Sequence, residues 1–447
     1  MKIYNILLVN PPYEPIGVKE SVSSASVTLS LAMLAGVAKA RNIDVHILDL
    51  NTSSNWQNDL RLSLEKYKPN LVGVTFATPL VKIASYIANE VRLRFGSSVM
   101  IIGGGPHASA KPIEFLQHSD YDAVAIGEAE KSFDDFLVHG SFEHIPGWVY
   151  KIGEQIISNQ PMPLIKNLDD LPFAAVELFD TTQYIYPADA SRENPVCLLE
   201  TSRGCYAYCI YCNKNIFGHK IRRKSSKRVV DEMQYILGCG FREIHFADDS
   251  FTADLNHAKG VCNEIINRGL SFPWVPRSGI RVDRVTPDLL NLMRKAGCYH
   301  TPFGIESGSQ EVLDRMKKGI TVDQVIRAVQ MSKDAGMETT GYFMFGLPGE
   351  TKDTIMKTIE FALQLRLDHI KFGVAIPLPG TEFFELLDQE GLLKTNDWEK
   401  FTYSTPPWEL YHHPSLDRDT LEQITINQER LMDVANRSIH FTRSSTA

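Results

Sequence analysis

Short apolar segments alternate with longer segments of helical periodicity along most of the chain, and this alternation constrains the fold more than any other feature. In the first third, the pattern predicts strands such as Ile3–Val9 and Leu71–Thr75, with helices such as Val81–Phe95 between them. Strands joined by a crossing helix pair in parallel, because the chain must return over the sheet before the next strand starts. We therefore expect a doubly wound, Rossmann-like α/β domain over residues 1–144.

A second βα series runs from the segment Val196–Glu200 to the segment Ile370–Ile376 and contains six strand patterns. Six such units predict a partial (β/α)6, TIM-like barrel over residues 195–385, with its active face at the carboxyl ends of the strands. Between the two series, prolines interrupt any periodic pattern, which indicates a linker over residues 145–194 that also packs between domains. Residues 386–447 are expected to form a small helical C-terminal extension.

Composition excludes several classes of protein. The chain of 447 residues exceeds what one hydrophobic core usually serves, and no apolar run is long enough to cross a membrane. The formal net charge of −8 offers no general attraction to nucleic acid. The seven cysteines are odd in number and too few for a disulfide framework, so a reducing, cytoplasmic location is favoured.

Three of these cysteines, Cys205, Cys209 and Cys212, follow directly on the first predicted barrel strand. A loop at this position can gather three thiolates, which would bind three irons of a four-iron cluster and leave the fourth iron open to a small molecule. A zinc site would need a fourth ligand, for which Cys197 and His219 are the near candidates. Ordinary core cysteines are the third interpretation that the residues alone leave open.

The C-x3-C-x2-C spacing, with Arg203-Gly204 before it and Tyr211 before the last cysteine, resembles the radical S-adenosylmethionine enzymes. The resemblance extends through further motifs at predicted strand ends. These are Phe246-Ala247-Asp248-Asp249-Ser250-Phe251, Gly304-Ile305-Glu306-Ser307, Phe345-Gly346-Leu347-Pro348-Gly349-Glu350-Thr351 and Pro377-Leu378-Pro379-Gly380-Thr381. Their order and spacing resemble the subgroup with an N-terminal cobalamin-binding domain, the class B methyltransferase-like enzymes.

This resemblance implies roles for individual residues. The three cysteines would hold a [4Fe-4S] cluster, Tyr211 would lie against the adenine of S-adenosylmethionine, and Glu306 with Ser307 would contact its polar part. For Glu306, a solvated carboxylate at a strand end is the alternative. Arg281 would pair with the carboxylate of S-adenosylmethionine or form a structural ion pair. Asp248 would touch the cofactor, orient the substrate or cap a helix.

In the first domain, Asn10-Pro11-Pro12 stands where a dinucleotide-binding fold needs its glycine fingerprint, and proline removes the required amide donors, which disfavours nicotinamide. The chain also lacks Asp-x-His-x-x-Gly after the first strand, so we expect a cobalt face without a histidine ligand, with His107 shaping the corrinoid loop. By resemblance, the cobalamin-binding residues are Pro11, Thr75, Thr78, Gly103, Gly104, Gly105, His107, Gly127 and Glu128.

The activity implied by the resemblance is methylation of an unactivated carbon, or sometimes phosphorus, in a small metabolite or natural product. It would use the cluster, S-adenosylmethionine and cobalamin, with electrons from a donor such as flavodoxin or ferredoxin. A cobalamin-dependent radical cyclisation or rearrangement without methyl transfer is the alternative among enzymes. A cofactor-binding sensor without turnover is the alternative from another class. The aromatic residues Trp398, Phe401, Tyr403 and Trp408 are candidates for the substrate wall or for a hydrophobic core.

Overall fold

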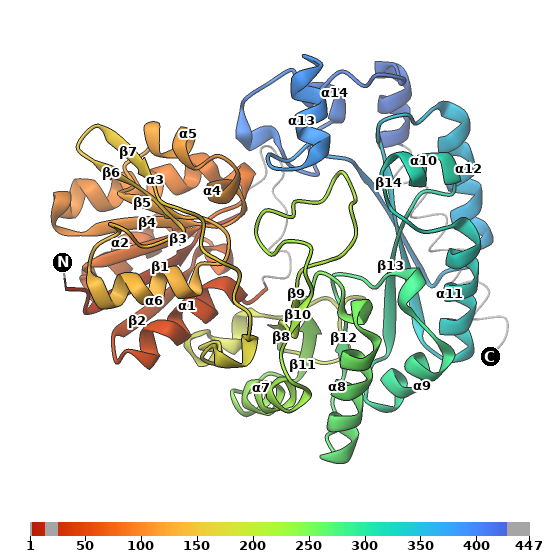
Figure 1. The fold of residues 1–447 in the computed structure, drawn as a ribbon, viewed down its shortest axis with the longest axis horizontal. Helices are drawn as coiled ribbons and strands as arrows, with labels where there is room; N and C mark the ends of the chain where they lie inside the picture. Colours follow the sequence, from red (N-terminus) through yellow and green to blue (C-terminus); the bar gives the residue numbers. More distant parts are fainter. Residues whose placement is uncertain (1, 14–25, 427–447) are drawn as a thin grey trace.

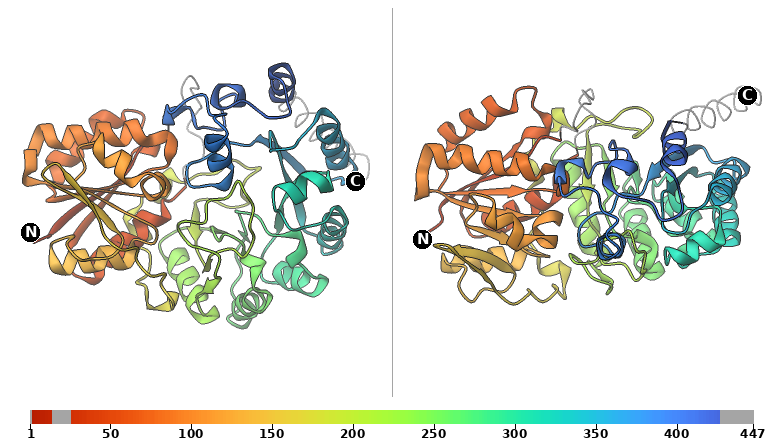
Figure 2. Two further views of the ribbon diagram at one scale, coloured as in Figure 1. Left: turned by 45° about the horizontal axis from the view of Figure 1, so that its top comes forward. Right: turned by 90° about the horizontal axis from the view of Figure 1, so that it is seen from above.

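The computed structural model describes residues 2–13 and 26–426, which form two α/β domains placed side by side (Figure 1). A C-terminal segment lies above the gap between them (Figures 1 and 2). The last part of the expected extension, residues 427–447, lies outside the described residues. The expected fold class, a doubly wound domain followed by a partial barrel, is confirmed.

The first domain is built on one sheet with the strand order β2-β1-β3-β4-β5-β6-β7. Strands β1 to β5 pair in parallel, while β6 and β7 add to the β5 edge in antiparallel fashion. The bounds are β1 (Asn5–Asn10), β2 (Asp44–Asp49), β3 (Leu71–Thr75), β4 (Met100–Gly104), β5 (Ala123–Ala125), β6 (Trp148–Ile152) and β7 (Gln155–Ser158).

Helices cover both faces of this sheet because successive strand residues point to opposite sides. Leu7 and Val9 pack into one core with α2 and α3, whereas Ile6 and Leu8 pack into the other core with α1 and α6. Both faces are therefore buried, as the apolar strand patterns predict. The helices are α1 (Leu29–Ala40), α2 (Trp56–Tyr67), α3 (Val81–Phe95), α4 (Pro106–Ala110), α5 (Pro112–Gln117) and α6 (Glu130–His139).

The expected linker, residues 145–194, differs from the expectation at its start. Strands β6 and β7 fall inside it and extend the first sheet, so this part is not an irregular connection. We accordingly propose that the first domain ends after Ser158. The remainder packs on both domains. Toward the first domain, the Phe173 carbonyl lies so close to α1 that a Cβ on Gly36 would meet it at 2.2 Å, and the Tyr184 hydroxyl donates to Asp49. The Tyr184 ring is also buried in a core cluster with residues of the barrel.

The barrel consists of two parallel three-stranded sheets with the orders β8-β11-β12 and β13-β14-β15. Parallel bridges from Trp274 to Cys298 and from Ile280 to Phe303 connect them. The third strand is shorter than the expected Val275–Arg281, because Pro276 lacks an amide donor and its carbonyl closes a turn with Gly279. The strands are β8 (Val196–Leu199), β11 (Glu243–Phe246), β12 (Trp274–Val275), β13 (His300–Glu306), β14 (Glu338–Phe345) and β15 (His369–Val374).

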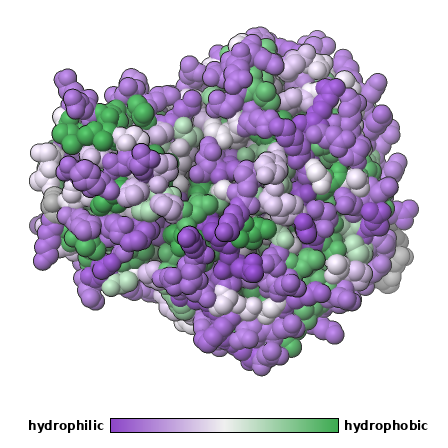
Figure 3. Space-filling model, in the orientation of Figure 1, coloured by the Kyte–Doolittle hydropathy of each residue, from purple (hydrophilic) through white to green (hydrophobic). Residues whose placement is uncertain are grey.

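Helices line the outer side of the barrel (Figure 2). Thr321 and Thr351 begin α11 and α12 with reciprocal capping boxes, which satisfy amides that the first helical turn leaves free. The helices are α7 (Ser226–Gly238), α8 (Leu255–Asn267), α9 (Pro287–Lys295), α10 (Gln310–Arg315), α11 (Val322–Asp334) and α12 (Lys352–Gln364). Within the described part of the chain, no helix has the length and apolarity of a membrane span. The face shown in Figure 3 is mostly hydrophilic.

The C-terminal segment joins the barrel to the first domain. It contains α13 (Glu382–Gln389), a short 3-10 helix (Trp398–Lys400) and α14 (Pro407–Leu410). The indole N–H of Trp398 donates to Glu114 at 2.9 Å, and its ring meets that of His107 edge-on at 5.3 Å between centroids. Trp398 therefore fixes the segment to the first domain, whereas Tyr403 is largely exposed.

Candidate functional site

The loop that carries the three cysteines leaves and re-enters the barrel through a two-stranded neck. Strands β9 (Ser202–Arg203) and β10 (Arg222–Arg223) pair in antiparallel fashion and enclose residues 204–221. The chain can begin the loop here because Gly204 adopts a φ of +89°, and a Cβ on it would lie 2.3 Å from the Lys220 carbonyl oxygen. The loop thus starts directly at the end of the first barrel strand, as the sequence predicts.

The three loop cysteines pack against one another and are free thiols. Cys205 and Cys209 are buried and form a small cluster with Ala207, against which Cys212 packs. Burial raises the pKa of Cys212, and the nearby Lys214 ammonium opposes this effect. The two possible fourth zinc ligands are engaged elsewhere: Cys197 is buried in the barrel core, and His219 stacks on Tyr208 at 4.4 Å. This arrangement favours the cluster over a zinc site.

Two aspartates at the end of β11 hold the start of this loop. The buried Asp248 carboxylate accepts hydrogen bonds from the Thr201 amide at 2.6 Å, the Thr201 hydroxyl at 2.5 Å and the Ser202 hydroxyl at 2.6 Å. Asp249 accepts from the Gly204 amide at 2.9 Å. Burial raises the pKa of Asp248 to about 7 despite these donors. Asp248 therefore acts on the loop backbone and neither caps a helix nor faces open space.

A second group of polar side chains gathers where β13 ends. The Glu306 carboxylate accepts from the Lys318 ammonium at 2.7 Å and from the Tyr211 hydroxyl at 3.1 Å. Glu306 adopts a φ of +69° at an irregularity in the β13–β14 register. Gly304 leaves room for this pair, since a Cβ there would lie 2.9 Å from the Glu306 carboxylate. Glu306 is thus a buried, paired carboxylate and not a solvated one.

Lys318 is not predictable from the sequence, because it has no recognisable motif and lies in a short basic run after α10. Arg281 and Ser307, which were expected in the same site, both have structural partners. The Arg281 guanidinium donates to Asp283 at 2.8 Å and to the Lys318 carbonyl at 3.0 Å, which is the structural ion pair. The Ser307 hydroxyl is buried against the Thr358 hydroxyl at 3.0 Å. These two residues shape the surroundings of Glu306.

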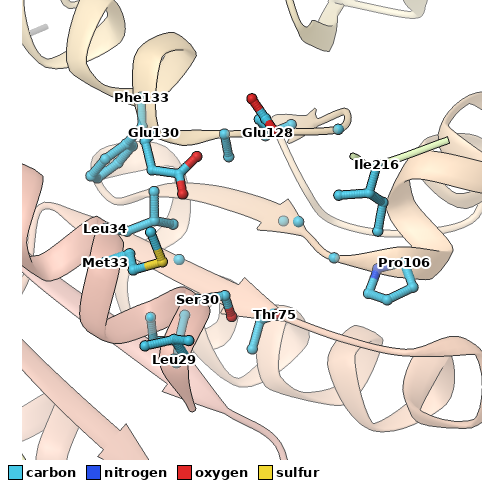
Figure 4. A pocket seen from close by; sticks show the side chains of 18 of the residues that line it. Leu29, Ser30, Met33, Leu34, Thr75, Pro106, Glu128, Glu130, Phe133 and Ile216 are labelled. Atoms are coloured by element: carbon cyan, nitrogen blue, oxygen red, sulfur yellow. The ribbon is translucent and has the colours of Figure 1, made fainter. Parts of the chain in front are cut away.

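A cavity of about 360 Å³ opens at the carboxyl ends of the first sheet's strands. Figure 4 shows Met33 and Leu34 of α1 on one side and Ile216 of the cysteine loop on the other. Glu200 and Ala247 from the barrel also line this cavity, so both domains form its wall. Of the residues expected to bind the corrinoid, six line it, namely Thr75, Gly103, Gly104, Gly105, Gly127 and Glu128.

The other three expected residues, Pro11, Thr78 and His107, lie outside the wall of this cavity. The His107 ring is buried 3.3 Å from the Thr78 hydroxyl, and burial lowers its pKa to about 4, so the imidazole is neutral. Its position between Thr78 and Trp398 suits a residue that shapes the loop after β4. His46, in β2, stacks on Tyr67 at 3.9 Å.

Family models match both domains. The B12 binding domain matches residues 16–137, and the Radical SAM superfamily matches residues 199–362. The chain is 33% identical to "Uncharacterized methyltransferase PH0819" of Pyrococcus horikoshii, over 93% of this chain and 90% of that protein. The chain belongs to the cobalamin-binding radical S-adenosylmethionine enzymes.

Two further proteins are similar over most of the chain. The anaerobic magnesium-protoporphyrin IX monomethyl ester cyclase of Rubrivivax gelatinosus is 27% identical, over 98% of this chain and 79% of that protein. The structure of the radical S-adenosylmethionine methyltransferase TsrM from Kitasatospora setae has a TM-score of 0.70 at 20% identity, covering 88% of this chain and 76% of that one. It shares the two-domain fold.

The residues present fit the groups that this family binds. The three thiols of this loop are of the type and number that would bind three irons and leave a fourth for S-adenosylmethionine, although the described residues hold no group of three side chains already arranged around an ion. Tyr211, next to Cys212 in the loop, donates its hydroxyl to Glu306. The cavity is open at its glycine edge, because a Cβ on Gly104 would meet nothing within 4 Å, so a ligand can approach the backbone there. Ligands of open parallel sheets bind at this carboxyl edge.

Replacing Glu306 by glutamine tests its role in binding S-adenosylmethionine. We expect the affinity to fall by about tenfold or more, because the neutral amide cannot pair with an ammonium group, while the iron content stays unchanged. Equilibrium dialysis with the reconstituted protein measures the affinity. Glu311→Gln, on the exposed face of α10, is the control. An unchanged affinity in Glu306→Gln would remove Glu306 from the site.

A buried carboxyl group under the loop after β14 makes stability depend on pH. Glu350 accepts from the Gly346 amide at 2.6 Å and the Leu347 amide at 3.1 Å, yet burial raises its pKa to about 7. The folded chain therefore retains this proton more strongly than the unfolded chain. The contribution of protonated Glu350 to the free energy of unfolding is complete below the ordinary carboxyl pKa. It is lost as the pH rises to about 7, by at most about 1.4 kcal/mol per pH unit.

Between pH 5 and pH 7, the free energy of unfolding of Glu350→Gln should therefore fall by about 1 to 2 kcal/mol less than that of the wild type. Denaturant unfolding of the cluster-free protein at the two pH values measures this difference. Glu360→Gln, at an exposed position of α12, should retain the wild-type pH dependence. Equal slopes for Glu350→Gln and the wild type would show that Glu350 is ionised throughout this range.

Proposed function

We propose that this enzyme transfers a methyl group to an unactivated carbon of a small metabolite or natural product. One observation carries the proposal: the cavity at the edge of the first sheet is also lined by the barrel and by the cysteine loop, through Glu200, Ala247, Ile216 and Phe217. A corrinoid in this cavity would therefore lie next to the loop that holds the cluster. Two domains that bound their cofactors independently would not need a common cavity wall.

When bound, the cluster with S-adenosylmethionine would supply radical chemistry, and cobalamin would supply the methyl carrier. The chain's own residues bind, orient and shield these groups. Glu306, with Lys318 and Tyr211 against it, presents one carboxylate for the amino group of S-adenosylmethionine. Asp248 and Asp249 fix the start of the cluster loop.

The C-terminal segment supports exclusion of water from the reaction space. Phe401 is buried in the barrel core, and Trp398 connects this core to Glu114 of the first domain. Lys82 of α3 adds ion pairs to Asp397 at 3.1 Å and to Glu399 at 2.5 Å. Tyr403, two residues after Phe401, is exposed, so it is the aromatic residue of this segment most available to a substrate.

The proposal can be tested without knowing the substrate. Reconstituted protein with bound cobalamin is incubated under reducing conditions with S-adenosylmethionine that carries a deuterated methyl group. We expect the label in the extracted corrinoid, because a methyltransferase of this kind must recharge its methyl carrier. Protein that binds cobalamin and cleaves S-adenosylmethionine but never labels the corrinoid contradicts methyl transfer.

A second candidate function is radical cyclisation or rearrangement without methyl transfer. It is favoured by the similarity over 98% of this chain to a relative named as a cyclase. The same experiment separates the two, since a cyclase has no need to label the corrinoid. For either function we propose a reducing cytoplasmic location and an electron donor such as flavodoxin or ferredoxin, because the cluster must be reduced before it reacts.

A further inference from the structure

The neck of the cluster loop is tied to the first domain by buried ion pairs. The guanidinium of Arg203, only 1% exposed, pairs with Glu130 of the first domain and with Glu200 at the end of β8, the latter at 2.7 Å. Arg222, its partner across the neck, pairs with Glu128. Both neck strands therefore depend on carboxylates that begin or precede α6.

The same carboxylates form part of the wall of the corrinoid cavity. Glu128, Glu130 and Glu200 line this cavity together with Arg203, and Figure 4 shows the side chains of Glu128 and Glu130 on its upper side. Arg203 also lies over the ring of Phe217, which belongs to the cluster loop and to the cavity wall, at 5.0 Å. One arginine thus contacts the cavity wall and stands two residues before Cys205.

This arrangement makes the two binding sites interdependent. If the cluster loop and its neck open, Arg203 leaves Glu130 and Glu200 without a partner inside a buried wall, which is costly. The cavity then loses its shape. Conversely, a ligand that fills the cavity holds the wall in place and keeps the neck closed. Coupling of this kind is reciprocal, because each ligand must change the affinity for the other by the same factor.

We propose that Arg203 is a positioning residue that couples the corrinoid cavity to the cluster loop. Cluster assembly raises the affinity of the cavity for cobalamin, and bound cobalamin stabilises the cluster loop. The proposal rests on the presence of both cofactors, as in the proposed function, but concerns their binding alone. It predicts an ordered, mutually dependent loading of the enzyme.

The first test compares cobalamin binding with and without the cluster. Hydroxocobalamin is titrated into the anaerobically reconstituted wild type and into the cluster-free variant Cys205→Ala/Cys209→Ala/Cys212→Ala. We expect binding to be at least about fivefold tighter in the cluster-loaded protein, within the usual range of couplings between sites. In the reciprocal measurement, wild type with cobalamin should retain more iron against a chelator than wild type without it.

The second test removes the connection. In Arg203→Met, the difference in cobalamin affinity between cluster-loaded and cluster-free protein should shrink to less than about twofold, whereas Arg268→Met should retain the full difference. Arg268 is a matched control because it pairs with Asp231 and Glu264 on the outer helices. If Arg203→Met does not fold, Glu130→Gln replaces it in this test, because it removes one carboxylate partner of Arg203 and preserves the pair between Arg203 and Glu200.

The outcomes distinguish the coupling from the function. Equal cobalamin affinities of cluster-loaded and cluster-free wild type overturn the coupling, and so does a folded Arg203→Met that keeps the wild-type difference. A merely structural role for Arg203 would weaken binding in both forms and leave their ratio unchanged. Absence of cobalamin binding in every form would instead contradict the proposed function.

Discussion

Replacing Cys205, Cys209 and Cys212 together by alanine is expected to abolish iron binding and to lower the formation of 5′-deoxyadenosine by more than about 10³-fold. The reason is chemical, since thiolates hold the cluster and alanine offers no ligand that could replace them. Because the loop neck is fixed through the Ser202 hydroxyl and the Gly204 amide, neither of which the substitutions change, the barrel should still fold. Iron analysis, visible absorbance and product chromatography measure these effects.

The matched control is Cys239→Ala, a partly exposed cysteine at the end of α7 that lies far from the loop in sequence and belongs to another cluster of residues. It should retain the iron content of the wild type. Normal iron content in the triple variant would show that other residues bind the metal. Loss of iron in Cys239→Ala would contradict the assignment of Cys205, Cys209 and Cys212 as the cluster ligands.

Replacing Gly104 by leucine is expected to weaken cobalamin binding by about 100-fold or more. The new side chain would extend into the corrinoid cavity, because a Cβ at Gly104 meets no atom within 4 Å and the residue has an ordinary backbone conformation. The protein should therefore fold normally while its cavity is filled. Methyl transfer should be lost, whereas S-adenosylmethionine cleavage should persist. Hydroxocobalamin titration and product analysis separate the two activities.

Gly238→Leu is the control for this substitution, since a Cβ at Gly238 also meets nothing within 4 Å and the residue ends α7 outside the cavity. It should bind cobalamin as the wild type does. Wild-type affinity in Gly104→Leu would place the corrinoid elsewhere. Loss of S-adenosylmethionine cleavage in Gly104→Leu, at unchanged iron content, would show that cobalamin is needed for the radical step as well.

Sequence patterns located the strands well because buried parallel strands must be apolar on both faces. The expected strand Leu71–Thr75 coincides with β3, and the expected strand Ile3–Val9 covers most of β1. The hairpin β6–β7 was missed because it is short, follows Pro146-Gly147 and pairs antiparallel at the sheet edge, where its Gln155–Ser158 strand is only partly buried. Strand β12 is shorter than expected because Pro276 follows it, and hydrophobic periodicity alone does not take account of a proline.

The candidate site was predictable where spacing carries the chemistry, as for the three cysteines, and where a glycine run ends a strand, as for Gly103 to Gly105. Lys318 and Arg203 were not assigned, because a basic residue gains its role only from the carboxylates that the fold brings to it. Glu306 meets Lys318 across 12 positions, and Glu130 meets Arg203 across 73. Pairings between domains leave no local pattern in a sequence.

The most direct test of the central claim is the joint content of iron and cobalamin in anaerobically purified and reconstituted protein. The two-site account predicts about four irons and about one cobalamin per chain. The cysteine triple variant should lose the iron and keep a weaker cobalamin site, and Gly104→Leu should lose the cobalamin and keep the iron. Iron without cobalamin in the wild type would contradict the account, because the enzyme would then lack its methyl carrier.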